Sequence, residues 1–311
     1  MIHLDGRYFK DEAGRTLLLR GVNLSGATKV PVIPNGATWN KVGFYDHRAV
    51  SFVGRPFPLA EADEHFRRLK AWGFTFLRFL ITWEAVEHAG PGIYDQEYLD
   101  YLYDVVKKAD EHGINIFIDP HQDVWSRFTG GDGAPGWTLE AAGFDLTRLN
   151  ETGAAITHQE KGDPFPRMVW PTNYGKLAAG TMFTLFFAGR DFAPQCTVDG
   201  VNIQDYLQGH YINAVKAVAL RLKGLPNVVG YDSLNEPSNG FIGEKDIRKT
   251  ASGIPALNDN APTMLQGMAL GAGCPQTVDV YNISILGMRK VGTRLLNPGR
   301  VSAWLPGRAD I

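Results

Sequence analysis

Along the chain, short runs of apolar residues alternate with longer stretches in which apolar residues recur every three or four positions. The short runs predict buried strands and occupy residues 16–19, 74–81, 114–119 and 228–234. The periodic stretches predict helices with one buried face and occupy residues 59–72, 95–112 and 203–222. We therefore expect four buried strands with helices between them.

The predicted helices carry suitable residues at their ends. Gly73 follows the first helix, and glycine is common just past a helix end. Asp95 can accept hydrogen bonds from the free amides at the start of the second helix, which is expected to end at His112-Gly113. Pro226 stops the third, because proline cannot continue a helix.

One apolar stretch, residues 177–189, lies outside this alternation. It is shorter than the ~18 residues that a membrane-spanning helix needs, and no longer apolar run occurs, so we expect no transmembrane segment. We expect the stretch to form a buried core helix. The alternative is that Met182, Phe183 and Phe186 line a cleft for an acyl chain or a sterol, because long apolar insertions near a site mark apolar ligands.

Strands that are apolar throughout predict a parallel sheet covered by helices, and so an α/β protein. Two architectures fit, an open doubly wound sheet and a (β/α)8 barrel, and both place their sites at the C-terminal ends of the strands. No Gly-x-Gly-x-x-Gly follows the first predicted strand, and no Walker-type lysine loop is present. The sequence therefore gives no support to nucleotide binding.

Composition narrows the class of protein further. The 311 residues are 44% hydrophobic and 21% charged, which predicts a globular protein with a large core. Lys and Arg number 31 against 33 Asp and Glu, so we expect no nucleic-acid partner. Cys196 and Cys274 are too few for a disulfide framework. Residues 1–15 carry charges where a signal peptide needs an apolar core, so we expect a cytoplasmic protein.

Polar side chains gather where the predicted strands end. Arg78 lies in the second strand, and His121 and Asp123 follow the third. Asn235 and Glu236 follow the fourth. Cleavage of a glycosidic bond needs a carboxyl that protonates the leaving oxygen, an amide that binds the neighbouring sugar hydroxyl, and a cation that keeps a partner carboxylate ionised. This set of residues therefore favours a glycosidase.

The motifs around these residues resemble glycoside hydrolase family 5, a (β/α)8 family of retaining β-glycosidases. The resemblance rests on Arg78 in Phe-Leu-Arg-Phe-Leu, His121 in His-Gln-Asp and the run Asn235-Glu236-Pro237. It extends over nearly the whole chain. Other segments resemble the endoglycoceramidase and β-glucosylceramidase branch, which includes steryl-glucosidase-like proteins, and these segments are residues 25–31, 79–83, 119–126 and 170–174.

The resemblance implies catalytic roles for three residues. Glu236 would be the general acid/base, Asn235 would hold the sugar 2-hydroxyl, and Arg78 would support the nucleophile carboxylate. This two-carboxylate mechanism implies no cofactor and no metal.

The resemblance also implies how the substrate is held. His121 would line the catalytic centre, while Asp123 and Lys29 would bind hydroxyls of the glycone. The implied substrate is a glycolipid such as glucosylceramide or a steryl glucoside. A soluble aryl or flavonoid glucoside, or an oligosaccharide, remains an alternative.

Each of these residues also has a plainer interpretation. Arg78 can be a structural ion pair, His121 a core histidine, and Lys29 a solvated surface residue. His121 and Asp123 can begin a metal site for a metal-assisted hydrolase, but three ligands are needed and no second histidine cluster accompanies them. A non-catalytic carbohydrate- or lipid-binding protein is the remaining alternative.

The sequence departs from the family after the fourth strand. Only 75 residues follow Glu236, whereas four more βα units of a ~250-residue barrel need ~125. Those residues are rich in Pro and Gly and lack helical periodicity before Val278. We therefore expect residues from about 240 to 311 to be mostly irregular. We expect them to border the active-site cleft together with a second insertion at about 120–200.

The family's nucleophile is a glutamate on the seventh strand. The only glutamate after Glu236 is Glu244, in the same predicted loop, so it cannot lie across a barrel from Glu236. We therefore expect residues 1–311 to be the N-terminal portion of one (β/α)8 catalytic domain. The C-terminal part of the same enzyme, as a separate polypeptide or a further segment, would complete the barrel and carry the nucleophile.

Overall fold

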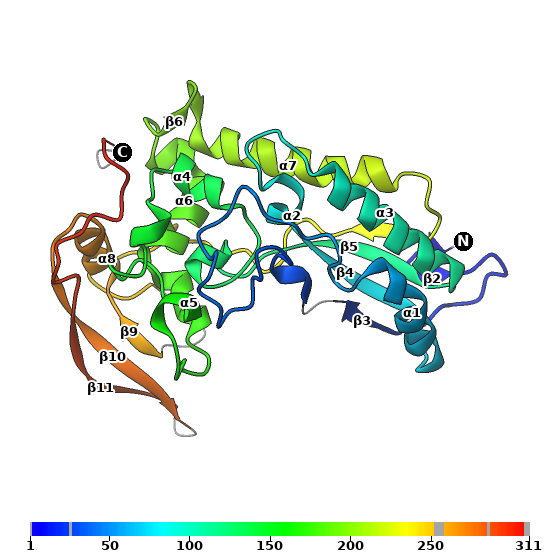
Figure 1. The fold of residues 1–311 in the computed structure, drawn as a ribbon, viewed down its shortest axis with the longest axis horizontal. Helices are drawn as coiled ribbons and strands as arrows, with labels where there is room; N and C mark the ends of the chain where they lie inside the picture. Colours follow the sequence, from blue (N-terminus) through cyan, green and yellow to red (C-terminus); the bar gives the residue numbers. More distant parts are fainter. Residues whose placement is uncertain (1, 25–26, 252–257, 285–286, 308–311) are drawn as a thin grey trace.

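A four-stranded parallel sheet forms the centre of the computed structural model (Figure 1), which describes residues 2–24, 27–251, 258–284 and 287–307. Its strands, in spatial order β3-β4-β5-β8, are Gly21–Leu24, Phe76–Thr82, Asn115–His121 and Val228–Tyr231. Parallel pairing confirms the predicted α/β class. The register sets Arg78 opposite Asn23 on one side and Phe117 on the other.

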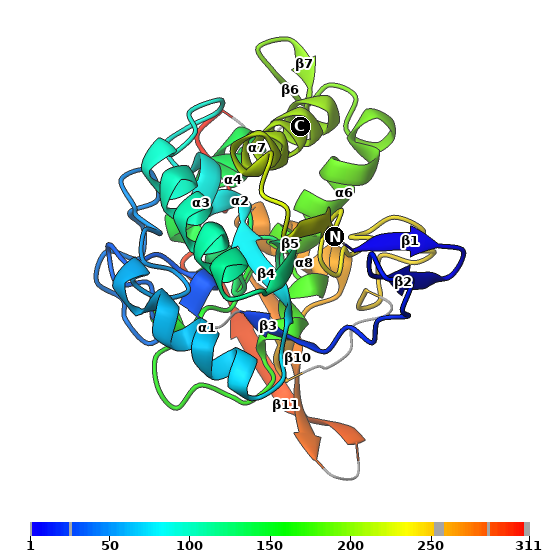
Figure 2. The same cartoon turned by 90° about the vertical axis from the view of Figure 1, so that its right-hand side faces the viewer.

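Helices cover one face of this sheet (Figure 2). They are α1 (Ala62–Ala71), α3 (Gln96–Glu111) and α7 (Ile203–Leu222). Leu77 and Ile116 are fully buried, as their alternating positions on the strands require. Phe76 and Phe117 point to the opposite face, stack at 5.8 Å between ring centroids and stay partly exposed. On the face covered by helices, the side chains of the central strands are therefore fully buried, whereas aromatic side chains on the opposite face remain partly exposed to solvent.

The predicted helix boundaries are largely confirmed. The Asp95 side chain accepts a hydrogen bond of 2.9 Å from the Tyr98 amide at the start of α3. Gly113 follows that helix with φ of 69°, a backbone conformation that favours glycine. Trp72 was expected to face inward with the first helix, but it lies at the helix end and is 65% exposed. The apolar periodicity of the sequence continues to Trp72, whereas the helical backbone ends at Ala71.

The first predicted strand was placed too early. Residues 16–19 are not in the parallel sheet, and Leu18 is 83% exposed. The Leu17 amide instead donates to the Phe9 carbonyl in an antiparallel hairpin. The hairpin strands are β1 (His3–Asp5) and β2 (Tyr8–Lys10). The sheet strand begins only at Gly21, where an added Cβ would lie 2.1 Å from the Phe76 carbonyl oxygen.

Residues from about 240 to 311 are irregular only in part, so that prediction was partly wrong where the structure describes them; residues 252–257, 285–286 and 308–311 lie outside that description. The segment forms β9 (Asp259–Ala261), α8 (Met264–Gly271), β10 (Gln276–Ser284) and β11 (Gly287–Leu296). Its sheet is antiparallel in the order β11-β10-β9. Glycine and proline lie in the turns between these elements and do not indicate one continuous loop. Helix α8 begins with a capping box formed by Thr263 and Gln266.

The apolar stretch forms helix α6 (Leu177–Phe192) in the core, as expected. Met182 and Phe183 are fully buried, so Met182 does not line a ligand cleft. Phe183 and Phe186 border a cavity of only about 20 Å³, which is too small for an acyl chain or a sterol. None of the described helices is long and apolar enough to cross a membrane.

Shorter elements complete the described chain. The helical ones are η1 (Ala27–Lys29), η2 (Leu59–Glu61), α2 (Trp83–Glu87), η3 (Arg127–Thr129), α4 (Gly136–Ala141), η4 (Leu146–Arg148), α5 (His158–Lys161) and η5 (Trp170–Gly175). A small antiparallel pair is formed by β6 (Thr197–Val198) and β7 (Val201–Asn202).

Candidate active site

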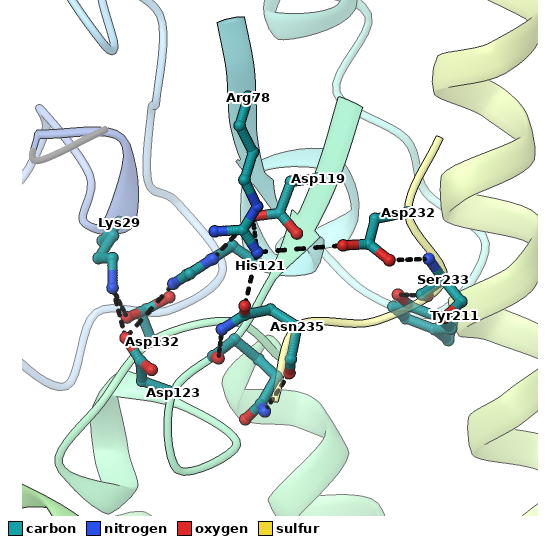
Figure 3. A network of polar contacts seen from close by, with 11 residues as sticks. Lys29, Arg78, Asp119, His121, Asp123, Asp132, Tyr211, Asp232, Ser233 and Asn235 are labelled. Carbon is teal, nitrogen blue, oxygen red and sulfur yellow. Dashed lines mark hydrogen bonds and ion pairs between the residues drawn. The ribbon is translucent and has the colours of Figure 1, made fainter. Parts of the chain in front are cut away.

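Three of the predicted site residues meet at the C-terminal edge of the sheet (Figure 3). Arg78 of β4 donates from Nη2 to Oδ1 of Asn235 at 2.6 Å, and the same nitrogen lies 3.0 Å from Oδ2 of Asp119. Nδ1 of His121 lies 2.8 Å from the same Asp119 oxygen. Asp119 and His121 are two positions apart on β5 and therefore point to one face. Arg78 thus forms a structural ion pair with Asp119 and also contacts Asn235, another predicted site residue.

Gln122 ties the loop after β5 to the segment that carries Asn235 and Glu236. Its Nε2 donates to the Asn235 carbonyl at 2.6 Å and to the Glu236 carbonyl at 2.9 Å. The Asn235 side chain returns a hydrogen bond of 3.0 Å to the Gln122 carbonyl. Asn235 is buried, while the Glu236 side chain is exposed and its backbone has φ of 37°. Two backbone carbonyls thus set the position of Glu236.

The other two predicted residues lie in a second cluster, which His121 joins to the first. Lys29 forms an ion pair with Asp123 and lies 3.4 Å from Oδ2 of Asp132. Nε2 of His121 lies 3.4 Å from Oδ2 of Asp123. Lys29 is therefore not a freely solvated lysine, and all six predicted site residues are at or next to the same strand ends.

Backbone geometry holds the Asp123 side of this cluster in place. The Asp123 amide donates to the Asp132 carbonyl at 3.1 Å, and the Asp132 amide donates back at 2.9 Å. A Cβ at Gly131 would lie 1.7 Å from the Asp123 carbonyl oxygen, so this close approach requires glycine. Val124 and Trp125 have φ of 53° and 78°, a left-handed conformation that is unfavourable for a β-branched residue such as valine.

Charge in the cluster is distributed unevenly. Burial lowers the pKa of His121, but hydrogen bonds to Asp119 and Asp123 outweigh it and raise that pKa to about 9. Burial opposes ionisation of Asp123, yet its bonds with His121 and Lys29 lower its pKa to about 2. Burial, reinforced by the Asp123 charge, raises the pKa of Asp132 to about 8. These shifts favour a cationic His121, an ionised Asp123 and a neutral Asp132 near neutral pH.

Sequence reasoning found no third ligand for a metal, but the structure supplies one. Side-chain atoms of His121, Asp123 and Asp132 all lie within 4.8 Å of one another. The Lys29 ammonium already contacts both carboxylates, so a divalent cation would compete with it for them. The cluster therefore suits the binding of hydroxyl groups better than the binding of a divalent cation.

A cavity of about 420 Å³ opens beside this cluster. Lys29, Asp123 and Asp132 form one part of its lining, and Phe165 and Trp170 contribute aromatic rings. Charged groups combined with aromatic surface are typical of a small-molecule site. No described residue from 240 to 311 lines this cavity, so the prediction that this segment borders the site is not met here.

The cluster predicts a loss of stability at alkaline pH. His121 has a folded pKa above its ordinary 6.5, so its contribution is complete below that pH and disappears as the pH rises through about 9. Asp132 has the same sign but a wider window: its folded pKa lies above its ordinary 3.8, so its contribution is complete below about pH 4 and declines as the pH rises to about 8. The melting temperature should therefore fall between pH 6.5 and 9.

Asp132→Asn mimics the neutral carboxyl and should reduce this alkaline decline when melting is followed by circular dichroism. Asp63→Asn is the matched control. Asp63 is a surface aspartate whose pKa is lowered by bonds from His112 and Lys108, so its contribution is lost only at acid pH. If the melting temperature of Asp132→Asn changed with pH in parallel with that of the unmodified protein between about pH 4 and 8, the assignment would be contradicted.

Two residues of the site, Asp119 and Asp132, were not predicted from the sequence. Asp119 lies two residues before His121 on a predicted strand, and that spacing was enough to place both on one face. Asp132 follows two glycines in a loop, and nothing in the local sequence shows that it returns to Asp123. Only the paired backbone bonds of the folded loop reveal it.

The parallel sheet and the residues at its strand ends fit the family that comparison with known proteins identifies. Residues 36–265 match the family Cellulase (glycosyl hydrolase family 5). The chain belongs to glycoside hydrolase family 5. It is 50% identical to a glucosylceramidase of Rhizopus delemar over 98% of this chain and 46% of that protein. It is 41% identical to the ergosteryl-beta-glucosidase of Saccharomyces cerevisiae, over 98% of this chain and 43% of the yeast protein.

Solved structures of enzymes named sterylglucosidase and endo-glycoceramidase also match this chain. Sterylglucosidase 1 of Cryptococcus neoformans superposes with a TM-score of 0.94 at 43% identity, covering 99% of this chain and 45% of that one. Endo-glycoceramidase II of a Rhodococcus species gives 0.51 at 30% identity, over 75% of this chain and 43% of the other. The chain spans about half the length of the curated relatives and structures that it matches.

Proposed function

We propose that this chain carries the acid/base half of a retaining β-glucosidase that acts on a glycolipid. The observation that carries the proposal is the hydrogen bond of 2.6 Å from Arg78 to Asn235, which joins strand β4 to the segment after β8, directly beside Glu236. In this arrangement, Glu236 protonates the departing oxygen and then activates the water that releases the sugar. Exposure of Glu236 leaves its carboxyl accessible to a substrate.

Asn235 is oriented for a sugar hydroxyl. Its Oδ1 accepts from Arg78 and one Nδ2 proton goes to the Gln122 carbonyl. One Nδ2 proton and one Oδ1 lone pair remain. They are the groups that bind the 2-hydroxyl, whose hydrogen bonds strengthen in the transition state. Arg78 fixes the amide and, as a cation at the same edge, favours the ionised form of a second carboxylate.

The second cluster holds the glycone. Ionised Asp123 accepts hydrogen bonds from sugar hydroxyls, while Lys29 and protonated His121 donate them. The cavity of about 420 Å³ next to these groups has room for a sugar. Trp170 offers an aromatic surface at its edge.

The nucleophile and the rest of the barrel lie outside these 311 residues in this proposal. Support comes from the sheet, where β3 and β8 each have one strand neighbour among the described elements. The partly exposed Phe76 and Phe117 on the inner face also need further packing. In the completed enzyme, the nucleophile carboxyl is expected ~5–5.5 Å from that of Glu236, the spacing of retaining enzymes.

Substrate comparison on the protein that contains this chain tests the function. We expect a higher kcat/KM for glucosylceramide or a steryl glucoside than for cellotetraose, as the relatives named glucosylceramidase and ergosteryl-beta-glucosidase suggest. NMR of the first-formed sugar should show the β-anomer, because two displacements retain configuration. Preference for cellotetraose would contradict the glycolipid substrate, and an α-anomer would contradict the mechanism.

A further inference from the structure

The hairpin of β10 and β11 extends beyond the rest of the molecule. Strand β9 pairs with β10 only at Asp279, Val280 and Tyr281. Past Tyr281, the two long strands pair with each other and project away from the body in both views (Figures 1 and 2). Every described residue of the hairpin from 282 to 295 is exposed. Residues 282–284 and 287–295 together form a surface that we call the distal hairpin.

Large apolar side chains lie on the distal hairpin. Ile283 and Met288 face each other across the two strands and are 38% and 53% exposed. Val291, at the bulge in β11, is 58% exposed. A projecting pair of strands with exposed apolar side chains tends to bind another surface. The charges beside these side chains indicate which kind of surface fits.

The charges on this hairpin are mainly positive. The two strands carry Arg289, Lys290 and Arg294 against the single acid Asp279, whereas the chain as a whole has a net charge of −2. Lys290 pairs with Asp279 at 2.7 Å, and Arg294 pairs with Asp259 of β9 at 2.5 Å. Arg289 directly follows Met288 and is exposed. Basic residues therefore adjoin the apolar pair.

We propose that the distal hairpin docks on the surface of an anionic lipid bilayer. Ile283 and Met288 enter the boundary between headgroups and acyl chains, while Arg289 and Lys290 contact lipid phosphates and carboxylates. A second copy of the chain fits less well, because a symmetric contact between hairpins would bring the basic residues of both copies together. A bilayer instead presents an apolar layer beneath a negatively charged one.

The docking deepens the proposed function, on which it rests in one respect: a glycolipid substrate lies in such a bilayer. Antiparallel pairing with β9 links the hairpin to the body of the protein. A protein anchored in this way stays at the surface where glycolipid headgroups are found. Turnover of a soluble glucoside has no such requirement.

Vesicle binding tests the proposal, with the protein that contains this chain and vesicles of phosphatidylcholine with or without phosphatidylserine. Sedimentation should show binding to the phosphatidylserine vesicles that weakens with added salt. I283D/M288D and, separately, R289E/K290E should each reduce this binding at least ~10-fold. The control L18D/L220D changes two residues that are 83% and 61% exposed elsewhere, and it should bind as the unmodified protein does.

Two activity assays separate this inference from the proposed function. Both hairpin variants should lose activity on glucosylceramide in vesicles and keep it on a soluble aryl glucoside. If the unmodified protein cleaves neither glucoside, the proposed function fails, and sedimentation alone still decides the docking. Unchanged vesicle binding by I283D/M288D would overturn the docking. Dimerisation that this variant abolishes, without vesicle binding by the unmodified protein, would overturn it in favour of a second copy.

Discussion

Glu236→Gln is expected to lower kcat/KM for glucosylceramide by ~1,000-fold, within the range that general acid catalysis contributes. The amide has nearly the shape of the carboxyl but cannot protonate the leaving oxygen. Aryl glucosides with good leaving groups need little protonation, so their first step should be much less affected. Steady-state and burst kinetics on both substrates, with and without azide, provide the measurement. Azide should restore the second step, since it attacks the glycosyl-enzyme without base assistance.

Glu244→Gln is the matched control for this experiment. Glu244 is the only other glutamate in the sequence after Glu236, and it follows in the same segment. Its replacement should leave kcat/KM within about twofold, because Glu244 is not one of the groups gathered at the strand ends. Equal losses on both substrate types in Glu236→Gln, with no azide rescue, would contradict the acid/base role. A large loss in Glu244→Gln would contradict a nucleophile outside this chain.

Arg78→Met is expected to impair stability and catalysis together. Asp119 is fully buried, and Arg78 is one of its two charged neighbours, at 3.0 Å. Removing Arg78 leaves the buried Asp119 with His121 as its remaining ion-pair partner among the described residues and costs up to about 3 kcal/mol of unfolding free energy. Asn235 would also lose the hydrogen bond that fixes its amide. A misplacement of that kind reduces kcat/KM by ~100-fold. Denaturant unfolding and kinetics measure the two effects separately.

Asp232→Asn is the control, because it removes a weaker partner of the same arginine. Asp232 lies 4.0 Å from Arg78 and is 41% exposed. An exposed pair contributes ~0–1 kcal/mol, so this variant should unfold nearly as the unmodified protein does. If Arg78→Met were as stable as Asp232→Asn, the buried pair with Asp119 would not have the importance assigned to it.

The sequence predicted best where one local signal determined the structure. Leu99 and Leu102 lie at helical spacing after the N-cap residue Asp95, and this local pattern was sufficient to predict helix α3. Arg78, His121 and Asn235 were brought together because parallel strands end at one edge. Long-range contacts were not predictable in this way. Nothing near Asp132 shows that its loop returns to Asp123, and Leu18 looked buried because apolar character alone does not reveal which strands have a neighbour.

The β10–β11 hairpin was missed for a related reason. Its strands mix charged and apolar residues, since they lie outside the core, and so they lack the apolar run that marks the buried strands. Glycine and proline between residues 240 and 311 then suggested one long loop. Turn residues mark the places where a chain changes direction, and short strands can fill the intervals between them.

The left-handed backbone at Val124 and Trp125 affects where substitutions can raise the thermal stability of this protein without lowering its turnover. Two unfavourable conformations next to Asp123 cost on the order of 1–3 kcal/mol each, and they persist because surrounding bonds enforce them. Glycine at position 124 would relieve the strain there, but it would also remove a fully buried valine side chain and loosen the loop that sets Asp123. Thermal stability and turnover therefore both depend on the valine at this position. Stabilising substitutions are best sought on the helical face of the sheet, away from the candidate site.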